Sequence, residues 1–405
     1  MGDPLEAVGF VLLGAGKPIV ICAVDWTGLL NEAHFAWRQA LADAADTDPD
    51  RVAVHCVHQH DTPMVCLEAQ RIVQGWPDVS PIADLGFFQE CLDRAAGAVD
   101  RALKQTRPIT GIGIGQAQVR QIASNRRIAR DEHGQVTEHR RSFCNDSTLR
   151  ALPEGLVDPW LKTVGFYDGP TKIAACHYYA THPQSHYGQG QISSDFVGLA
   201  RRRRQQDEPD CRHLYFTGCA GNISAGKYND GSVAMRPVLV DRLYQAIVQS
   251  EQDLRPVEID RITWKTADLY PLPRDTLRID SLENRITDPD VQIYYGGQAA
   301  FMLAWLRRLQ DEKPITISAL QINDAYLLHL PAECFVQYQL RAQQMRPDDF
   351  IAVAAYGDGG PWYVPVKEEY PYGGYEVSVA FCDPQIDDLL TASIRRTLGV
   401  QSGRQ

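Results

Sequence analysis

The 405-residue chain lacks any apolar run long enough to cross a bilayer, and it lacks an excess of positive charge. A membrane-spanning helix needs about 20 consecutive apolar residues, so the sequence predicts no transmembrane segment. The formal net charge is −11, whereas the surface of a nucleic-acid-binding protein is normally basic. We therefore expect a globular protein that neither spans a membrane nor binds nucleic acid.

Paired cysteines are missing as well. The 10 cysteines are scattered and form no Cys-x-x-Cys motif, which excludes a zinc ribbon and a thioredoxin-like site. Cys22 in IVICAV and Cys176 in IAACHYY lie in apolar, strand-like runs, as small buried hydrophobic residues do, and we predict no disulfide framework. The start, MGDPLEAVGFVLL, has neither the basic segment nor the cleavage site of a signal peptide. It fits a cytoplasmic protein or a trimmed chain.

Short apolar runs rich in β-branched residues alternate with helical patterns along the whole chain. The expected strands lie at 7–13, 18–24, 52–60, 110–122, 160–168, 172–180, 212–218, 258–268, 315–330 and 350–355. The expected helices lie at 30–46, 82–105, 195–206, 235–251, 295–310, 332–346 and 384–398. Residues 124–157 are polar and predict a long surface excursion, a kind of segment that is often functional. No repeat or linker divides the chain, so we predict an α/β protein: one large domain with a mixed β-sheet flanked by helices.

The segment VAVHCVHQHDTP (52–63) draws attention because it puts three of the 11 histidines and one cysteine within six residues. If the strand continues through it, His58 and His60 share one face and His55 lies on the other. Chemistry in open α/β sheets collects at the carboxyl ends of strands. This pair is therefore a candidate for a metal ligand beside an acid–base group or a second ligand. The alternative is a buried strand whose histidines bond to local carbonyl groups.

Four further stretches could complete such a site. HYYATHPQSHYGQGQISSDF holds His177, expected to pack in its strand, His182 at the strand end, and His186 in a glycine-rich loop. Small residues in YFTGCAGNISAGKYNDG would let Ser224 or loop amides face a substrate. In LHLPAECFVQYQL, Glu333 is expected to open a helix, where a glutamate ordinarily compensates the helix dipole. GPWYVPVKEEYPYGGYEV packs five aromatic residues among glycines and prolines and predicts a rigid loop that lines a pocket or an interface.

Taken in order, these stretches resemble segments of the neutral/alkaline (non-lysosomal) ceramidase family, in its large N-terminal catalytic domain. VHQHDTP is similar to the family's HTHSGPG segment, and YYATHPQSHYGQGQISSDF to its FAVHGTSM…ISGDN segment. GNISAG, LPAECFVQ and WYVPVKEEYPYGGYE are similar to its GDVSPN, PGE and YVTTPEEY…HYEG segments. The resemblance runs from DPLEAVGFVLL to about residue 380. It implies that residues 1–405 form the catalytic domain and that the family's C-terminal immunoglobulin-like domain is absent.

The resemblance also implies a set of site residues around one Zn²⁺ ion. The implied zinc ligands are His58, His182, Glu333 and Tyr363. His60, the second histidine of the pair, would carry a proton to the leaving amine. Tyr375 would donate its hydroxyl to the developing oxyanion. Arg126 in SNRR would face the substrate, as would Ser224 in the weaker GNISAG match, where Asn222 and Ala225 stand in place of an aspartate and a proline.

The sequence thus predicts a zinc-dependent hydrolase of an amide bond, with a ceramide-like N-acyl lipid as the leading substrate and peripheral contact with a membrane. Two alternatives stay open: a metal-free hydrolase that uses Ser224 or Cys219, and a non-catalytic relative whose metal site is structural or binds a ligand. Because members of the family are mostly secreted or face a membrane, the resemblance favours an exported protein with its signal removed. The oligomeric state and the acyl chain stay open.

Overall fold

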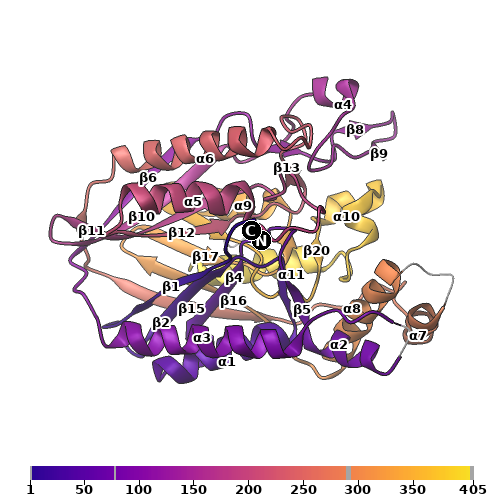
Figure 1. Ribbon diagram of the computed structural model, residues 1–405, viewed down its shortest axis with the longest axis horizontal. Helices are drawn as coiled ribbons and strands as arrows, with labels where there is room; N and C mark the ends of the chain where they lie inside the picture. The colour runs from indigo at the N-terminus through magenta and orange to yellow at the C-terminus, as the bar shows by residue number, and fades with distance from the viewer. Residues whose placement is uncertain (1, 77–78, 289–292, 402–405) are drawn as a thin grey trace.

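Three β-sheets hold most of the strands in this computed structural model, which describes residues 2–76, 79–288 and 293–401 (Figure 1). The first sheet has the strand order β1(Ala7–Leu12), β2(Ile19–Val24), β4(Val52–Cys56). The second is ordered β12(Arg212–Thr217), β11(Thr171–Tyr179), β10(Trp160–Asp168), β6(Gly111–Gln118), β14(Val257–Glu258). The third is ordered β15(Ile262–Leu269), β16(Ile315–Ile322), β17(Ala325–His329), β19(Phe350–Ala354). Each sheet contains one parallel pair, β2 with β4, β11 with β12 and β17 with β19, and is otherwise antiparallel.

Helices cover the outer faces of these sheets, as the alternation of patterns predicts. α1(Glu32–Ala45) and α3(Leu85–Leu103) pack on the first sheet, and α5(Asp195–Asp207) and α6(Met235–Gln252) pack on the second (Figure 1). The third sheet is covered by α9(Val336–Met345) and α11(Ile386–Thr397). The other helices are α2(Leu67–Gln74), α4(Ser147–Ala151), α7(Ile279–Thr287), α8(Ile293–Gln310) and α10(Tyr375–Ser378). One continuous hydrophobic cluster joins residues from all three sheets, so the described chain is a single α/β domain.

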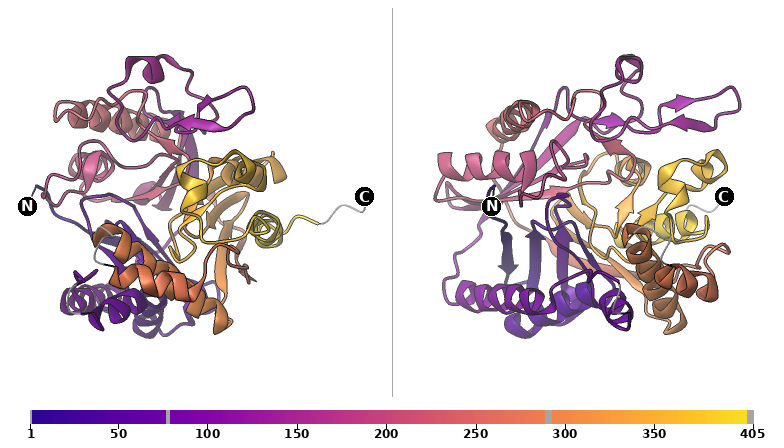
Figure 2. Two further views of the ribbon diagram at one scale, coloured as in Figure 1. Left: turned by 90° about the vertical axis from the view of Figure 1, so that its right-hand side faces the viewer. Right: turned by 45° about the vertical axis from the view of Figure 1, so that its right-hand side comes forward.

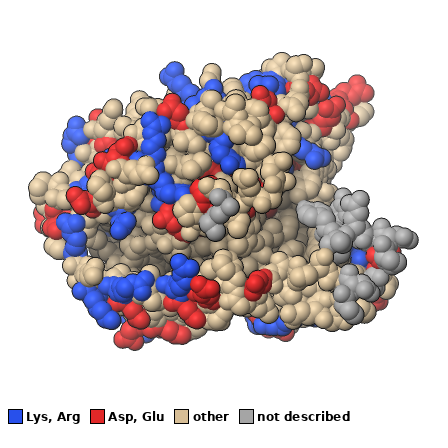
Figure 3. All heavy atoms as spheres, in the orientation of Figure 1, with Lys and Arg blue, Asp and Glu red and all other residues tan. Residues whose placement is uncertain are grey.

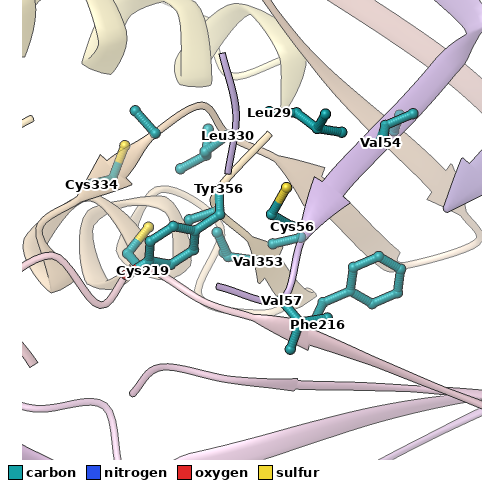
Figure 4. Packing of buried hydrophobic residues seen from close by; sticks show 14 of the residues in the cluster. Leu29, Val54, Cys56, Val57, Phe216, Cys219, Leu330, Cys334, Val353 and Tyr356 are labelled. Atoms are coloured by element: carbon teal, nitrogen blue, oxygen red, sulfur yellow. The ribbon is translucent and has the colours of Figure 1, made fainter. Parts of the chain in front are cut away.

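The three sheets meet at the carboxyl ends of their parallel strands. Strand β12 packs against β2, β4 and β19, which belong to the other two sheets. Backbone hydrogen bonds fasten these ends: Cys56 N donates to Tyr356 O at 2.9 Å, and Ala355 N donates to Thr217 O at 2.9 Å. Figure 4 shows the buried apolar residues that pack at this junction. They include Cys219, Cys334, Tyr356, Val57 and Phe216. Loops that follow four different strands are therefore brought to one place.

Short strands then shape those loops. Two-stranded pairs are formed by β3(Gly28–Leu30) with β5(Met64–Cys66), β7(Ser124–Asn125) with β13(Ile223–Ser224), β8(Ala129–Arg130) with β9(Val136–Glu138), and β18(Glu333–Cys334) with β20(Tyr363–Val364). The expected excursion at 124–157 contains the β8–β9 hairpin and α4, which project from the body of the domain (Figure 1 and Figure 2). This excursion contributes Arg126 to the site described below.

The α/β class and the positions of most long elements are as predicted, but several details differ. The single strand expected at 315–330 is a hairpin of β16 and β17. The mixed strands divide among several sheets where one was expected. Strand β4 ends at Cys56, so His58 and His60 lie in a loop and not on one face of a strand. Glu333 lies in β18 and α9 begins only at Val336, so the glutamate does not open a helix.

The surface gives further context. Within the described ranges, no helix is long and apolar enough to cross a membrane. On the face drawn in Figure 3, positive and negative side chains are interspersed. That face shows no broad basic surface of the kind that binds nucleic acid.

All 10 cysteines have free thiols, and every one but Cys91 is buried.

Candidate metal centre

The loop after β4 presents His58 to the centre of the molecule. Its backbone has φ 74°, in the left-handed region that non-glycine residues seldom adopt. The side chain is buried, and its Nδ1 lies 2.6 Å from the carbonyl oxygen of Thr27. A carbonyl only accepts hydrogen bonds, so Nδ1 carries the proton, and in the neutral ring Nε2 is left with its lone pair. The Tyr356 ring stacks on the imidazole with 4.2 Å between centroids and holds its orientation.

His182 is held in the same way from the loop after β11. The side chain is fully buried, and its Nδ1 lies 2.6 Å from Ala220 O and 3.0 Å from Ile223 O. Nδ1 therefore carries a proton, and Nε2 is the nitrogen that faces Glu333. Burial lowers the pKa of His182, and this effect outweighs the contact with Glu333, which raises the pKa.

Glu333 and Tyr363 come from the paired strands β18 and β20. They are direct partners in the parallel register, and Glu333 N donates to Trp362 O at 3.0 Å. The Glu333 Oε2 atom lies 3.0 Å from His182 Nε2 and 3.3 Å from His58 Nε2. The Tyr363 ring lies nearly parallel to that of His182, with 6.5 Å between their centroids. Residues separated by as much as 305 positions thus form one cluster, with His58 at one end of the span and Tyr363 at the other.

The donor atoms of this cluster suit a cation. Two imidazole lone pairs and a carboxylate oxygen would repel one another at 3.0–3.3 Å, unless a proton or a metal lies between them. Burial raises the pKa of the Glu333 carboxyl, but the two imidazoles outweigh this and hold it well below its usual range. The carboxylate is therefore ionised. Two imidazoles oriented by backbone carbonyls, together with a carboxylate, form a donor set that Zn²⁺ commonly takes in proteins.

His60 lies beside this cluster. Its Nε2 is 3.4 Å from His58 Nε2, and the ligand atoms of His58, His60 and His182 all lie within 4.8 Å of one another. Burial lowers the pKa of His60 well below its ordinary value, and the neighbouring imidazoles act in the same direction. The His60 ring also contacts Tyr187, with 5.6 Å between centroids, in the loop before α5. This position suits either a further ligand or a group that exchanges a proton with a bound molecule.

Arg126 and Tyr375 lie beside Tyr363. Arg126 is buried, donates from Nη1 to Tyr363 Oη at 3.2 Å, and has its guanidinium 5.6 Å from the centre of the Tyr375 ring. Tyr375 is 39% exposed and lies 5.6 Å, centroid to centroid, from Tyr363. Both residues are therefore near the predicted ligand Tyr363, and Tyr375 lies at the rim where a substrate could reach it.

Ser224 and Cys219 are placed differently. Ser224 is fully buried in β13, and its hydroxyl donates to the carbonyl of Arg141 at 3.2 Å. Cys219 is also fully buried. Neither residue forms a hydrogen bond with a histidine anywhere in the described ranges. The arrangement that activates a serine or cysteine nucleophile is thus not present around either side chain.

A second buried group of possible ligands, His177, His213 and Glu251, lies under α5 and α6. As expected, His177 packs in the sheet, where its Nδ1 lies 2.9 Å from the Thr163 hydroxyl. Lys172 Nζ lies 3.1 Å from a Glu251 carboxylate oxygen. Arg204 also pairs with Glu251, at 2.6 Å. Two cations therefore already neutralise this group, and a metal ion would be repelled.

Several residues of the site carry no sequence signal of their own. The Thr27 carbonyl acts through its backbone, and Tyr356 follows β19 without any motif that we identified. Glu376 is adjacent to Tyr375 in the quoted aromatic stretch, so its position could have singled it out. Its role depends on contacts with the distant excursion at 124–157.

Comparisons with known proteins bear on the fold. No protein-family model matches the chain, and no curated protein matches it in sequence. Among solved structures, it is similar to the neutral ceramidase from Pseudomonas aeruginosa, with TM-score 0.70 and 16% identity, covering 97% of this chain and 68% of that one. A structure described as ceramidase complexed with C2 gives TM-score 0.68 and 15% identity, covering 98% and 71%. The chain has a neutral-ceramidase-like fold. At this identity the similarity establishes the fold alone.

Proposed function

We propose that the protein is a zinc-dependent hydrolase that cleaves the amide bond of an N-acyl lipid, with a ceramide-like molecule as the leading substrate. The observation that carries the proposal is the convergence of His58 Nε2 and His182 Nε2 on one Glu333 oxygen, at 3.3 and 3.0 Å, while both Nδ1 atoms face backbone carbonyls. The similarity of the fold to ceramidases supports the choice of an amide substrate.

His58, His182, Glu333 and Tyr363 would hold the ion. When bound, Zn²⁺ would supply Lewis acidity, which lowers the pKa of water and polarises a carbonyl group. Tyr363 keeps a neutral phenol in the present environment, because burial and then Glu333 raise its pKa well above the ordinary value. The ion would counter both effects, since it brings positive charge next to the phenol oxygen.

The remaining side chains would act on the substrate. The Arg126 guanidinium and the Tyr375 hydroxyl would donate hydrogen bonds to the oxygen that gains negative charge when the amide carbon is attacked. His60 would accept a proton from the attacking water and deliver it to the leaving nitrogen of the amide. An amine leaves far more readily once it is protonated. Ser224, whose buried hydroxyl forms a hydrogen bond with Arg141 O, would support its own loop rather than contact the substrate.

The test measures release of sphingosine from N-hexanoylsphingosine in mixed micelles, and of amine from a water-soluble N-acetyl amide. We expect turnover that is lost after chelation and restored by Zn²⁺. Activity that resists chelation but is abolished by covalent serine or thiol reagents would instead support the metal-free hydrolase. Metal binding without turnover, with chelation lowering only the melting temperature, would support the non-catalytic relative.

Export of the protein stays a prediction, which fractionation of the source cells would check.

A further inference from the structure

A buried carboxylate, Glu376, lies directly behind the proposed substrate-binding side. It is in the first turn of α10, next to Tyr375, and its side chain has no exposed surface. Its Oε2 accepts from Arg127 Nη1 at 2.9 Å and lies 2.9 Å from His139 Nε2. Its Oε1 lies 3.3 Å from Arg126 Nε. Three groups from the excursion at 124–157 therefore meet on this one carboxylate.

These contacts belong to a chain of alternating charges. Arg127 bridges Glu376 to Glu369, donating to Glu369 Oε2 from Nη2 at 2.8 Å. Glu369 in turn pairs with Arg130 of the β8–β9 hairpin at 2.8 Å. Glu376 and Glu369 are thus comparable carboxylates that share Arg127, but only Glu376 contacts Arg126.

The contacts of Arg126 show what Glu376 does. Glu376 lies against Nε, Tyr363 Oη takes the hydrogen bond from Nη1, and the guanidinium lies 5.6 Å from the centre of the Tyr375 ring. Within the described residues, Nη2 makes no hydrogen bond. The separation of 3.3 Å between Nε and Oε1 is an ion pair that does not meet hydrogen-bond geometry, so charge attraction holds the guanidinium in place. An arginine with one side fixed by a buried carboxylate can keep its other N–H groups directed at a ligand.

We propose that Glu376 is the positioning residue for Arg126: it fixes the guanidinium so that Arg126 is aimed at both Tyr363 and the substrate carbonyl. This inference rests on the proposed function, because the orientation of the Arg126 guanidinium matters for activity only if a substrate binds beside it. Glu376 itself touches neither the substrate nor the predicted metal ligands.

The test compares Glu376→Gln with the matched control Glu369→Gln on N-hexanoylsphingosine, at full zinc loading. A misplacement of about 1 Å in a catalytic group can cost about 100-fold in rate. We expect Glu376→Gln to lower kcat by about that factor with little change in KM, and Glu369→Gln to lower it by less than about 3-fold. Glu376→Asp should recover part of the lost rate.

Two further readouts separate positioning from a structural role. In an Arg126→Lys background, Glu376→Gln should cost less than about 3-fold more, because residues that act as a unit are not additive. Zinc content should stay unchanged in Glu376→Gln. Equal losses of kcat in the two glutamine variants, or multiplied losses in the double variant, would overturn the proposal.

Failure of the proposed function looks different. A wild-type protein with no zinc and no turnover on either amide would remove the reason for aiming Arg126, and the positioning role would fall with it. A wild-type protein that binds zinc and cleaves the amide, with a Glu376→Gln variant as fast as the wild type, would refute only the positioning role.

Discussion

At the scale of single residues, the site depends on which nitrogen of each imidazole faces a carbonyl. Thr27 O takes Nδ1 of His58, and Ala220 O and Ile223 O take Nδ1 of His182. These backbone contacts fix the orientation of both rings, so that both Nε2 atoms face Glu333. The sequence offered the histidines and the glutamate as candidates through their resemblance to a family. It could not offer the carbonyl partners, because any residue type supplies a carbonyl and only the fold selects which one.

Glu376 gives a prediction about acid stability. Burial raises the pKa of its carboxyl, but Arg126, His139 and Arg127 outweigh this and lower it from 4.5 to about 2. Because the folded pKa is depressed, the ionised group stabilises the fold above about pH 4.5, and this contribution of roughly 3 kcal/mol is lost as the pH falls towards 2. In urea unfolding of metal-free protein, the stability difference between wild type and Glu376→Gln should shrink from pH 7 to pH 3.

The control for this titration is Glu368→Gln. Glu368 is an exposed neighbour whose side chain is 70% accessible and pairs with Arg341. Its replacement should change stability by less than about 1 kcal/mol at every pH. A difference between wild type and Glu376→Gln that stays constant from pH 7 to pH 3 would contradict the assignment of an ionised, paired carboxylate.

At the scale of elements, the long strands and helices follow from sequence pattern and the short ones do not. Strands such as β2, which is buried along its whole length, show as continuous apolar runs and could be predicted. The two-residue strands β18 and β20 are too short to show a period, yet their pairing places Glu333 beside Tyr363. The same limit explains why the strand after Val52 was expected to reach His60, since its apolar run gives no sign of the turn at His58.

The β18 strand gives a prediction about Gly221. Gly221 N donates to Cys334 O at 2.8 Å, and a Cβ added to Gly221 would lie 2.3 Å from Glu333 O. Gly221→Ala should therefore displace Glu333, lower zinc affinity at least about 10-fold and cost about 1–3 kcal/mol of stability. Competition with a chromogenic chelator measures the affinity, and urea unfolding measures the stability.

Gly75→Ala is the matched control, because there the added Cβ meets nothing closer than Ile72 O at 3.4 Å. That variant should bind zinc as the wild type does. If Gly221→Ala also binds zinc with unchanged affinity, Glu333 does not contribute to the metal centre in the way described here.

At the scale of the whole molecule, the centre exists only where three sheets meet. Its residues follow β4, β11, β17 and β19, and they approach one another because the carboxyl ends of those strands converge. The α/β class could be predicted because alternation of strands and helices is a local property. The convergence of the strand ends is not a local property. From the sequence alone, the site residues could be linked to one another only through the order of five short motifs. A metal bound there would join all three sheets, so its binding free energy would also stabilise the fold.

The metal content of the purified protein tests the central claim most directly. Wild type, His182→Ala and His186→Ala would be supplied with zinc, freed of excess by gel filtration and measured by elemental analysis. His186 is the control because it lies four residues from His182, and its Nδ1 faces Gly231 O at 2.7 Å, away from Glu333. The account predicts about one zinc per chain in the wild type and in His186→Ala, and its loss in His182→Ala. A wild-type chain without metal, or a His182→Ala chain that retains it, would contradict the account.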